Sequence, residues 1–241
     1  MSVDLIQTFL DIIYPVRCPV CGEIVLPKGK RICTACKERL PYIGEPGCMR
    51  CSKPLEHEEQ EYCSDCERKS YHYDRGYAVW VYNEDMRHSI ADFKYHSKKE
   101  NAKFYIHEML CRYGDKIGAL SVDAVIPVPV HRSKYRERGY NQAEILAKGI
   151  GRELELPVFP KLLTRTKKTM PQKKLSDKER LQNLSEAFRY NERYALQPIR
   201  KVLLVDDIYT TGSTIEACTN VLKSKGVEEV YFLVLCIGKG F

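Results

Sequence analysis

Four C-x-x-C pairs in the first quarter of the chain constrain its fold more than any other feature of the sequence. Each pair starts 15 residues after the previous one, in a chain of 241 residues with 11 cysteines. Two thiolates three positions apart on a tight turn can occupy two corners of a tetrahedron, so two pairs complete one four-sulfur zinc site. The pairs therefore predict two structural Zn²⁺ sites, with the ligands Cys18, Cys21, Cys33, Cys36, Cys48, Cys51, Cys63 and Cys66.

The spacing leaves open which pairs share a metal ion. Sequential sharing makes two zinc ribbons in tandem, whereas alternate sharing makes a crossed brace. We favour the tandem arrangement, because the connections are short and the segment CKERLPYIGEP (36–46) contains turn residues. Zinc would stabilise a segment too small and polar to fold alone, so we expect chelation to unfold residues 18–66 and to leave the later domain largely folded.

The rest of the cysteine usage agrees with a reducing compartment. The start of the chain, MSVDLIQTFLDIIYPV, carries Asp4 and Asp11 and has no basic leader, so we expect a cytoplasmic protein with metal ligands rather than disulfides. Its apolar residues have helical spacing and predict a short helix on the protein's own core, and no segment is apolar enough to span a membrane. We expect the other three cysteines to be buried, inert thiols: Cys111, Cys218 and Cys236.

Positive charge is concentrated in the middle of the chain. Residues 131–182 hold 14 Lys and Arg against 6 Asp and Glu, a net charge of +8, whereas residues 1–70 hold 10 against 11, a net charge of −1. An anionic ligand is therefore attracted most strongly to the middle of the chain. The cysteine-rich part contains the acidic run EHEEQE (56–61), so the sequence leaves open whether this part contacts nucleic acid or has a structural or protein-binding role.

After residue 70 the sequence alternates between strand and helix patterns. This alternation predicts an α/β domain with a parallel sheet over residues 71–241, after a helix and double zinc ribbon over residues 1–70. Ligands of such sheets bind at the carboxyl ends of the strands. The expected strands are 77–83, 123–130, 187–191, 201–207 and 229–237, and the expected helices are 84–96, 101–113, 141–154 and 212–226.

The segment VLLVDDIYTTGST (202–214) combines a buried strand, two carboxylates and a turn into a helix. Asp206 and Asp207 emerge at the carboxyl end of the strand, and the helix N-terminus that follows favours a phosphate group. Adjacent carboxylates repel each other and require a donor or cation between them. The pattern predicts a ribose 5-phosphate site, and the alternative is a capped helix beside solvated aspartates. The loop residues with suitable hydroxyl groups or backbone freedom are Thr210, Thr211, Gly212, Ser213 and Thr214.

This segment resembles the phosphoribosyl-pyrophosphate (PRPP) loop of type I phosphoribosyltransferases. The order of motifs is more specific, and it resembles the ComF family of competence-associated proteins over nearly the whole chain. The resemblance implies a type I phosphoribosyltransferase-like parallel sheet with a small N-terminal double zinc ribbon. The matching motifs are the four C-x-x-C pairs, DFKYH (92–96), IPVPVHRSKYRERGYNQAEILA (126–147), RTKKTMPQKKLSDKERLQNLSEAF (165–188) and the loop itself.

The resemblance also implies roles for individual residues. Asp206 and Asp207 would hold the ribose hydroxyls of PRPP, the loop 210–214 would hold its 5-phosphate, and residues 165–180 would form a mobile loop over the site. PRPP arrives chelated to Mg²⁺, so magnesium is implied. The segment after the first core strand would hold the diphosphate, with cations and backbone access from Arg132, Lys134, Arg136, Arg138 and Gly139.

Two functions fit these expectations. The resemblance implies a PRPP-binding protein that acts with DNA-uptake proteins on incoming single-stranded DNA during natural transformation. The alternative is a phosphoribosyltransferase of nucleotide salvage that acts on a small base or amine. No residue identifies a nucleophile or base, so the catalytic residues stay unknown, and the sequence leaves open whether the chain is an enzyme. Release of pyrophosphate from PRPP would distinguish the two functions.

Overall fold

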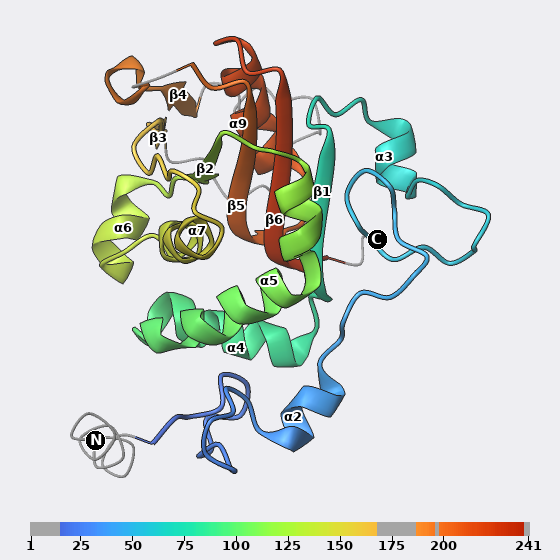
Figure 1. Ribbon diagram of the computed structural model, residues 1–241, viewed down its shortest axis with the longest axis vertical. Helices are drawn as coiled ribbons and strands as arrows, with labels where there is room; N and C mark the ends of the chain where they lie inside the picture. Colours follow the sequence, from blue (N-terminus) through green and yellow to red (C-terminus); the bar gives the residue numbers. More distant parts are fainter. Residues whose placement is uncertain (1–14, 168–186, 196–197, 239–241) are drawn as a thin grey trace.

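A four-stranded parallel sheet lies at the centre of the computed structural model, which describes residues 15–167, 187–195 and 198–238 (Figure 1). The strand order is β1-β6-β5-β2, and each neighbouring pair is parallel. This confirms the expected α/β class. The strands are β1 (Arg75–Val81), β2 (Ala124–Pro127), β5 (Lys201–Tyr209) and β6 (Glu229–Ile237), and a separate antiparallel pair consists of β3 (Leu163–Arg165) and β4 (Phe188–Tyr190).

Both faces of the sheet are buried, which explains the continuous apolar runs of its strands. Successive side chains of β5 point to opposite faces, so Leu203 and Val205 belong to one apolar cluster while Val202 and Leu204 belong to another. The two clusters are the two halves of the core, and the sheet separates them.

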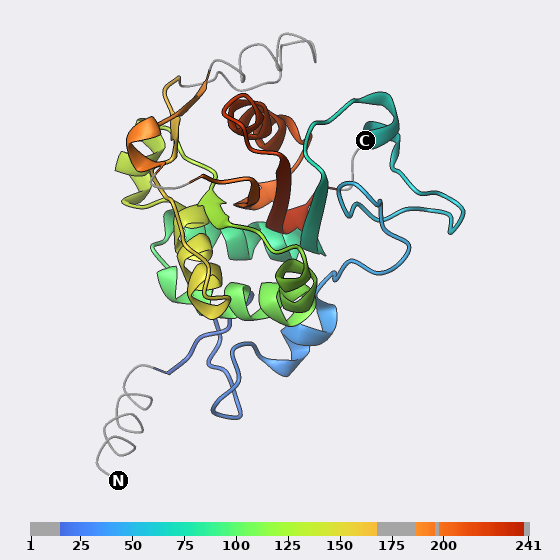
Figure 2. The same ribbon diagram turned by 45° about the horizontal axis from the view of Figure 1, so that its top comes forward.

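Three helices cover the face that carries Leu203 and Val205 (Figure 2). The first of them begins at a predicted boundary, where Asn83 caps the helix by accepting a hydrogen bond from the Met86 amide. Its buried residues Met86, Ile90 and Phe93 follow the helical period that the sequence indicates. The helices are α4 (Glu84–Tyr95), α5 (Ala102–Ala119) and α7 (Gln142–Glu153), with the 3₁₀ turn η1 (Lys99–Asn101) between the first two.

The opposite face is covered by α9 (Ser213–Lys223) together with residues from the β3–β4 pair (Figure 2). Ile215, Cys218 and Leu222 of α9 pack in the same cluster as Leu163 and Phe188 of the small sheet. A 3₁₀ turn, η3 (Glu192–Tyr194), follows β4. The segment between β3 and β4 that the sequence assigns to a mobile loop lies mostly outside the described residues.

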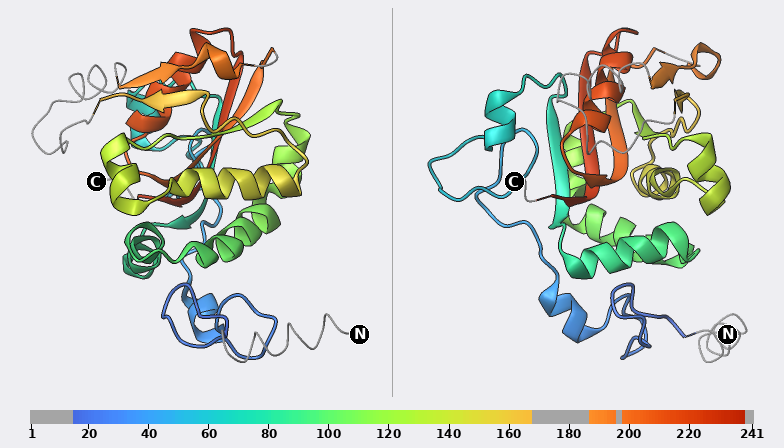
Figure 3. Two further views of the ribbon diagram at one scale, coloured as in Figure 1. Left: turned by 90° about the vertical axis from the view of Figure 1, so that its left-hand side faces the viewer. Right: turned by 180° about the vertical axis from the view of Figure 1, so that it is seen from behind.

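The two zinc ribbons join different halves of the core. The first ribbon (residues 15–40, with α2, Thr34–Arg39) lies beyond α4 and α5, where Ser89 donates a hydrogen bond of 2.6 Å to the Pro19 carbonyl (Figure 3). The second ribbon (residues 47–68, with α3, Ser64–Arg68) contributes its four cysteines to the cluster under α9. The ribbons are thus continuous with the core, which argues against separate unfolding of residues 18–66.

Two expectations about local structure are corrected. Cys111 is exposed rather than buried, because it lies on the outer face of α5 next to His107. The segment after β2 contains a short helix, α6 (Arg132–Arg138), which the sequence patterns do not predict. Cys218 and Cys236 are fully buried as expected. The predicted N-terminal helix lies outside the described residues, and none of the helices in the described ranges is long and apolar enough to cross a membrane.

Candidate functional site

The acidic pair lies where β5 extends past its neighbour. β2 ends at Pro127, which pairs with Val205, so no strand of the described residues pairs with the next two residues of β5 on that side. Asp206 and Asp207 are therefore presented at the carboxyl edge of the sheet. The backbone amide of Asp207 donates a hydrogen bond of 2.8 Å to the Asp206 carboxylate.

A lysine provides the cation that the acidic pair requires. Lys94, near the end of α4, places its ammonium nitrogen 2.8 Å from a carboxylate oxygen of Asp207. Their side chains are only 16% and 12% exposed, so water screens this pair weakly. Burial disfavours the charged ammonium, but Asp207 and Asp206 outweigh this effect and raise the pKa of Lys94. Lys94 therefore stays charged at neutral pH.

In the ranges that the structure describes, no lysine or arginine forms an ion pair with the second carboxylate, Asp206. Removal from water and the nearby charge of Asp207 raise the pKa of Asp206 to about 7. The guanidinium of Arg165, at the end of β3, and the ammonium of Lys94 lower it only in part. Asp206 therefore changes its charge near neutral pH, and its ionised carboxylate can accept a hydrogen bond from a hydroxyl or bind a cation.

The loop after β5 turns into α9 through one left-handed residue. Gly212 has φ of +75° and is the N-cap of α9, which has no side-chain cap. A helix N-terminus leaves its first N–H groups without helical partners, so the start of α9 can accept an anion. Thr211 and Ser213 share a hydrogen bond of 2.9 Å between their hydroxyls, and Thr210 is exposed. The structure thus places the predicted loop residues Thr210, Thr211, Gly212, Ser213 and Thr214 directly beside the acidic pair.

The predicted diphosphate segment is a helix rather than an open loop, and the side chains of Lys134 and Arg138 both lie over the ring of Tyr95. The charge of Arg138 lowers the pKa of Lys94, and Arg138 donates hydrogen bonds to Gln142 and Tyr95. Lys134 is paired with Glu137 at 2.9 Å, and Arg136 is exposed on the surface of α6. Gly139 ends α6 in a left-handed conformation, with φ of +77°.

An open cleft of about 670 Å³ connects this segment with β3. Arg132 lines the cleft from the side of α6, and Arg165 lines it from β3. Burial lowers the pKa of the Arg165 guanidinium, which the Cys218 and Asp206 side chains oppose only in part. Arg165 also lowers the pKa of Asp206, so this guanidinium belongs both to the cleft and to the surroundings of the acidic pair. Its other lining residues include Tyr135, Asn141, Lys161, Thr164 and Thr166.

The eight cysteines form two separate four-sulfur groups in sequential order. The Sγ atoms of each group lie within 4.8 Å of one another, as Cys18, Cys21, Cys33 and Cys36, and as Cys48, Cys51, Cys63 and Cys66. A tetrahedral zinc ion with Zn–S bonds of ~2.3 Å places its sulfurs ~3.8 Å apart. The Sγ separations of 3.8 Å for Cys21–Cys33 and 3.7 Å for Cys51–Cys63 fit that geometry. Both groups are structural zinc sites, and the predicted tandem arrangement is confirmed.

Comparisons with known proteins agree with this architecture. A double zinc ribbon domain model matches residues 9–67, and a phosphoribosyl transferase domain model matches residues 139–240. Competence protein F of Haemophilus influenzae is 42% identical over 108 residues, which cover 45% of this chain and 47% of that protein. Competence protein ComFC of Bacillus subtilis is 24% identical over 149 residues, which cover 62% of this chain and 58% of that protein. The chain is thus similar to these competence proteins and combines a double zinc ribbon with a phosphoribosyl transferase domain.

Other similar proteins cover comparable parts of this chain. DNA utilization protein YhgH of Escherichia coli strain K12 is 33% identical over 116 residues, which cover 47% of the chain and 49% of that protein. The chain thus spans about half the length of these curated relatives. Among solved structures, orotate phosphoribosyltransferase from Aeropyrum pernix is 19% identical, with a TM-score of 0.37 over 59% of this chain and 63% of that one.

Sequence reasoning missed two contributors to the site. Lys94 belongs to the motif DFKYH, but only the packing of α4 against the edge of β5 reveals its pairing with Asp207. Its signal in the sequence is weak: a charged residue directly after the buried Phe93. Tyr71, just after the second ribbon, donates a hydrogen bond of 2.9 Å to the Thr211 carbonyl, and no local pattern indicates this contact.

Proposed function

We propose that this chain is a ComF-type protein that binds PRPP at the carboxyl edge of β5 and acts in the cytoplasm on incoming single-stranded DNA during natural transformation. One observation carries the proposal: the acidic pair is followed, within a few residues, by a helix N-terminus that can bind an anion. Asp206 and Asp207 directly follow the buried run 202–205 of β5, and the loop from Thr210 leads directly into α9. A ribose 5-phosphate matches this order, because its hydroxyls donate to carboxylates and its phosphate accepts from N–H and O–H groups.

The diphosphate of PRPP would lie toward the cleft between α6 and β3. Arg132 and Arg165 line this cleft and can neutralise the diphosphate charge. Mg²⁺ prefers oxygen ligands, and the carboxylates of Asp206 and Asp207 provide them next to the oxygens of the ligand itself. If transfer from the ribose occurs, these cations would stabilise the departing pyrophosphate.

The DNA part of the proposal rests on the names of the relatives and on the charge of the chain. Two relatives are called competence proteins, and another is called a DNA utilization protein. Tyr95 is half-exposed, and the guanidinium of Arg138 lies 4.9 Å from the centre of its ring. Such aromatic and cationic side chains bind single strands by stacking and by phosphate contacts, with an affinity that falls as salt rises.

Titration calorimetry of PRPP with and without Mg²⁺ tests the binding site. We expect the double variant Asp206→Asn, Asp207→Asn to bind PRPP at least about tenfold more weakly, since hydrogen bonds to charged groups contribute ~1.5–3 kcal/mol each. Asp123→Asn is the matched control: Asp123 accepts the amides of Arg200 and Lys201 at the opposite end of β5. Equal affinity of the double variant and the control would refute the site.

A pyrophosphate assay separates the proposal from nucleotide salvage. We expect PRPP to bind without catalytic release of pyrophosphate from a panel of bases and amines, and single-stranded DNA to bind in a salt-sensitive manner. Catalytic release with one acceptor would instead identify a salvage-type phosphoribosyltransferase.

A further inference from the structure

We propose that the second zinc ribbon (residues 47–68) holds the loop 210–214 in its binding conformation through Tyr71, so that zinc in this ribbon and PRPP at the loop strengthen each other's binding. Tyr71 is a positioning residue in this inference, which rests on the PRPP site proposed above. The first ribbon, in the other half of the core, has no part in it.

The segment that follows the last zinc ligand contacts the loop region directly. The Tyr71 hydroxyl donates a hydrogen bond of 2.9 Å to the carbonyl of Thr211, inside the loop. The next residue, His72, donates its backbone amide over 2.9 Å to the carboxylate of Glu216, and its ring nitrogen Nδ1 contacts the same carboxylate. Glu216 lies in the first turn of α9, so this segment is hydrogen-bonded both to the loop 210–214 and to the helix start that follows it.

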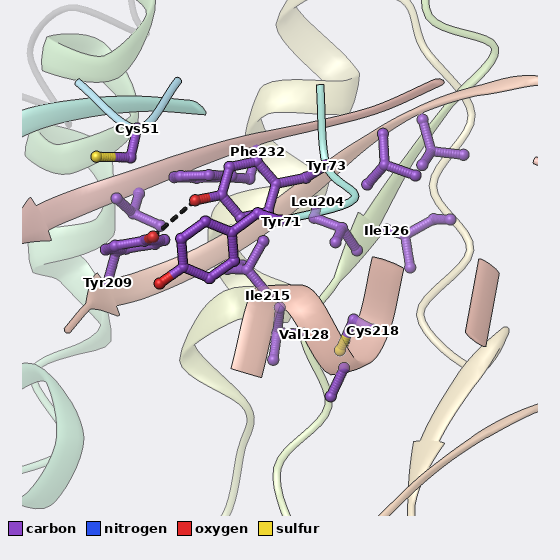
Figure 4. Close-up of a cluster of buried hydrophobic side chains, with 14 of the residues drawn as sticks. Cys51, Tyr71, Tyr73, Ile126, Val128, Leu204, Tyr209, Ile215, Cys218 and Phe232 are labelled. Atoms are coloured by element: carbon purple, nitrogen blue, oxygen red, sulfur yellow. Dashed lines mark hydrogen bonds between the residues drawn. The ribbon is translucent and has the colours of Figure 1, made fainter. Parts of the chain in front are cut away.

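The rings of Tyr71, Tyr73 and Tyr209 lie side by side in the core (Figure 4), and two of them contact the loop 210–214. Tyr73 shares a hydrogen bond of 2.7 Å with the hydroxyl of Tyr209, the last residue of β5. A Cβ atom on Gly212 would lie 2.4 Å from the Tyr209 hydroxyl and 3.1 Å from a ring carbon of Tyr71. The left-handed turn of the loop is therefore in close contact with these two rings, and a shift of either ring would displace it.

The same rings are packed against the zinc site. All four cysteines of the second ribbon belong to the apolar cluster that contains Tyr71, Tyr73 and Tyr209, and Figure 4 shows Cys51 beside these rings. The ribbon is also bonded to the start of β1. The Gly76 amide donates a hydrogen bond of 2.7 Å to the Arg50 carbonyl, and the Ser52 hydroxyl donates one of 2.7 Å to the Gly76 carbonyl.

These contacts make the ribbon and the loop one packed unit. Loss of zinc would leave four buried thiols without the ion that organises them, which would loosen the segment between Cys66 and Gly76 and with it Tyr71. A mobile Tyr71 would no longer donate its hydrogen bond to the Thr211 carbonyl. PRPP would then have to order the loop on binding, and the entropy lost in this step would weaken its affinity. Because such a coupling is reciprocal, PRPP should in turn hold zinc more tightly in the second ribbon.

The first test is the affinity of Tyr71→Phe for PRPP, which removes one hydroxyl and leaves the ring. We expect binding about fivefold weaker than in the wild type, the size expected for one hydrogen bond. Tyr113→Phe is the matched control, because the buried Tyr113 hydroxyl also donates to a backbone carbonyl, that of Ala78 at 2.8 Å. It should lose comparable stability and keep its PRPP affinity within about twofold.

The second test reads zinc retention on the full-length protein. A chelator releases zinc, iodoacetamide alkylates the freed thiols, and mass spectrometry locates them. We expect PRPP to slow alkylation of Cys48, Cys51, Cys63 and Cys66 roughly threefold or more, with little effect on the four cysteines of the first ribbon. Tyr71→Phe should abolish this protection, whereas Tyr113→Phe should keep it.

The outcomes distinguish failure of the coupling between zinc and PRPP, called the link below, from failure of the PRPP site itself. A wild-type protein that does not bind PRPP overturns the proposed function and this inference together. If the wild type binds PRPP but Tyr71→Phe binds it as tightly as Tyr113→Phe does, the link alone is overturned. Equal protection of both ribbons by PRPP overturns it as well, because that pattern reflects general stabilisation.

Discussion

Lys94 on α4 and Asp207 on β5 form a largely buried ion pair with an N–O distance of 2.8 Å, although 113 positions separate them in the sequence. The pair fixes the end of α4 against the edge of the sheet. It also neutralises one of two adjacent carboxylates, so the acidic pair can exist before any ligand arrives. A ligand that donates hydroxyls to Asp207 must share this carboxylate with Lys94.

Removal of Lys94 should therefore destabilise the protein. We expect Lys94→Met to lower the free energy of unfolding by about 3 kcal/mol, because it leaves Asp207 charged, buried and without its cation. Urea unfolding measures this change.

Two controls separate charge from packing in this experiment. Adding Asp207→Asn to Lys94→Met should restore part of the lost stability, since the uncompensated charge is then gone. Lys148→Met breaks the exposed Lys148–Glu144 pair on α7 and should change stability by less than about 1 kcal/mol. An effect of Lys94→Met as small as this would mean that the buried pair contributes nothing.

Asp206 should make stability depend on pH near neutrality. Its pKa is raised from 3.8 in the unfolded chain to about 7 in the fold, so folding favours the protonated form. Its contribution to stability is therefore fully present below about pH 4 and is lost as the pH rises through about 7. We expect Asp206→Asn to be more stable than the wild type above pH 7 and similar to it near pH 4, as measured by melting temperature. Parallel melting curves for the two proteins across this range would contradict the assignment.

The same titration should appear in ligand affinity with the opposite sign. Ribose hydroxyls donate to the ionised carboxylate, so PRPP should bind more tightly as the pH rises through about 7. Phosphate groups of the ligand also titrate, with a pKa near ~6. The informative quantity is thus the affinity of the wild type relative to Asp206→Asn, measured by calorimetry between pH 6 and 8. This ratio should grow with pH, and a constant ratio would exclude Asp206 from contact with the hydroxyls.

Local patterns predicted the parts of the site that are contiguous in the chain. The strand, the acidic pair and the turn into α9 lie within 202–214, so apolar runs and turn residues indicate all three. The spacing of the cysteines likewise predicted two zinc sites, because the ligands of each knuckle are only three positions apart. The patterns predicted a ribose 5-phosphate, and the family resemblance added the diphosphate of PRPP and the segment that would hold it.

Contacts between distant segments could not be predicted in this way. Lys94 and Tyr71 reach the site only because α4 packs at one edge of β5 and the second ribbon packs under the loop. The contacts of the cations on α6 depend on their neighbours. Lys134 pairs with Glu137, and Arg138 donates a hydrogen bond to Tyr95. Tertiary packing, rather than propensity, decides each of these positions.

Chelation of zinc should destabilise the whole chain, in contrast to what the sequence suggested. Cys18 and Cys36 share an apolar cluster with Trp80, and the second ribbon shares the cluster under α9. We expect the zinc-free protein to unfold in one transition at lower temperature, with loss of near-ultraviolet circular dichroism and a red shift of Trp80 fluorescence. Retention of both signals after chelation would instead show that the later domain folds without the ribbons.

Gly212→Ala should disrupt the loop through both its backbone and its packing. The residue has φ of +75°, which costs an alanine ~1–2 kcal/mol, and the new Cβ would lie 2.4 Å from the Tyr209 hydroxyl. Gly226→Ala isolates the first effect, because Gly226 has φ of +92° and open space where a Cβ would lie. We expect Gly212→Ala to lose more stability than Gly226→Ala in urea unfolding, and to lose PRPP binding that Gly226→Ala retains. If the two variants behave alike, the close contact between the loop and the Tyr209 ring has no energetic consequence.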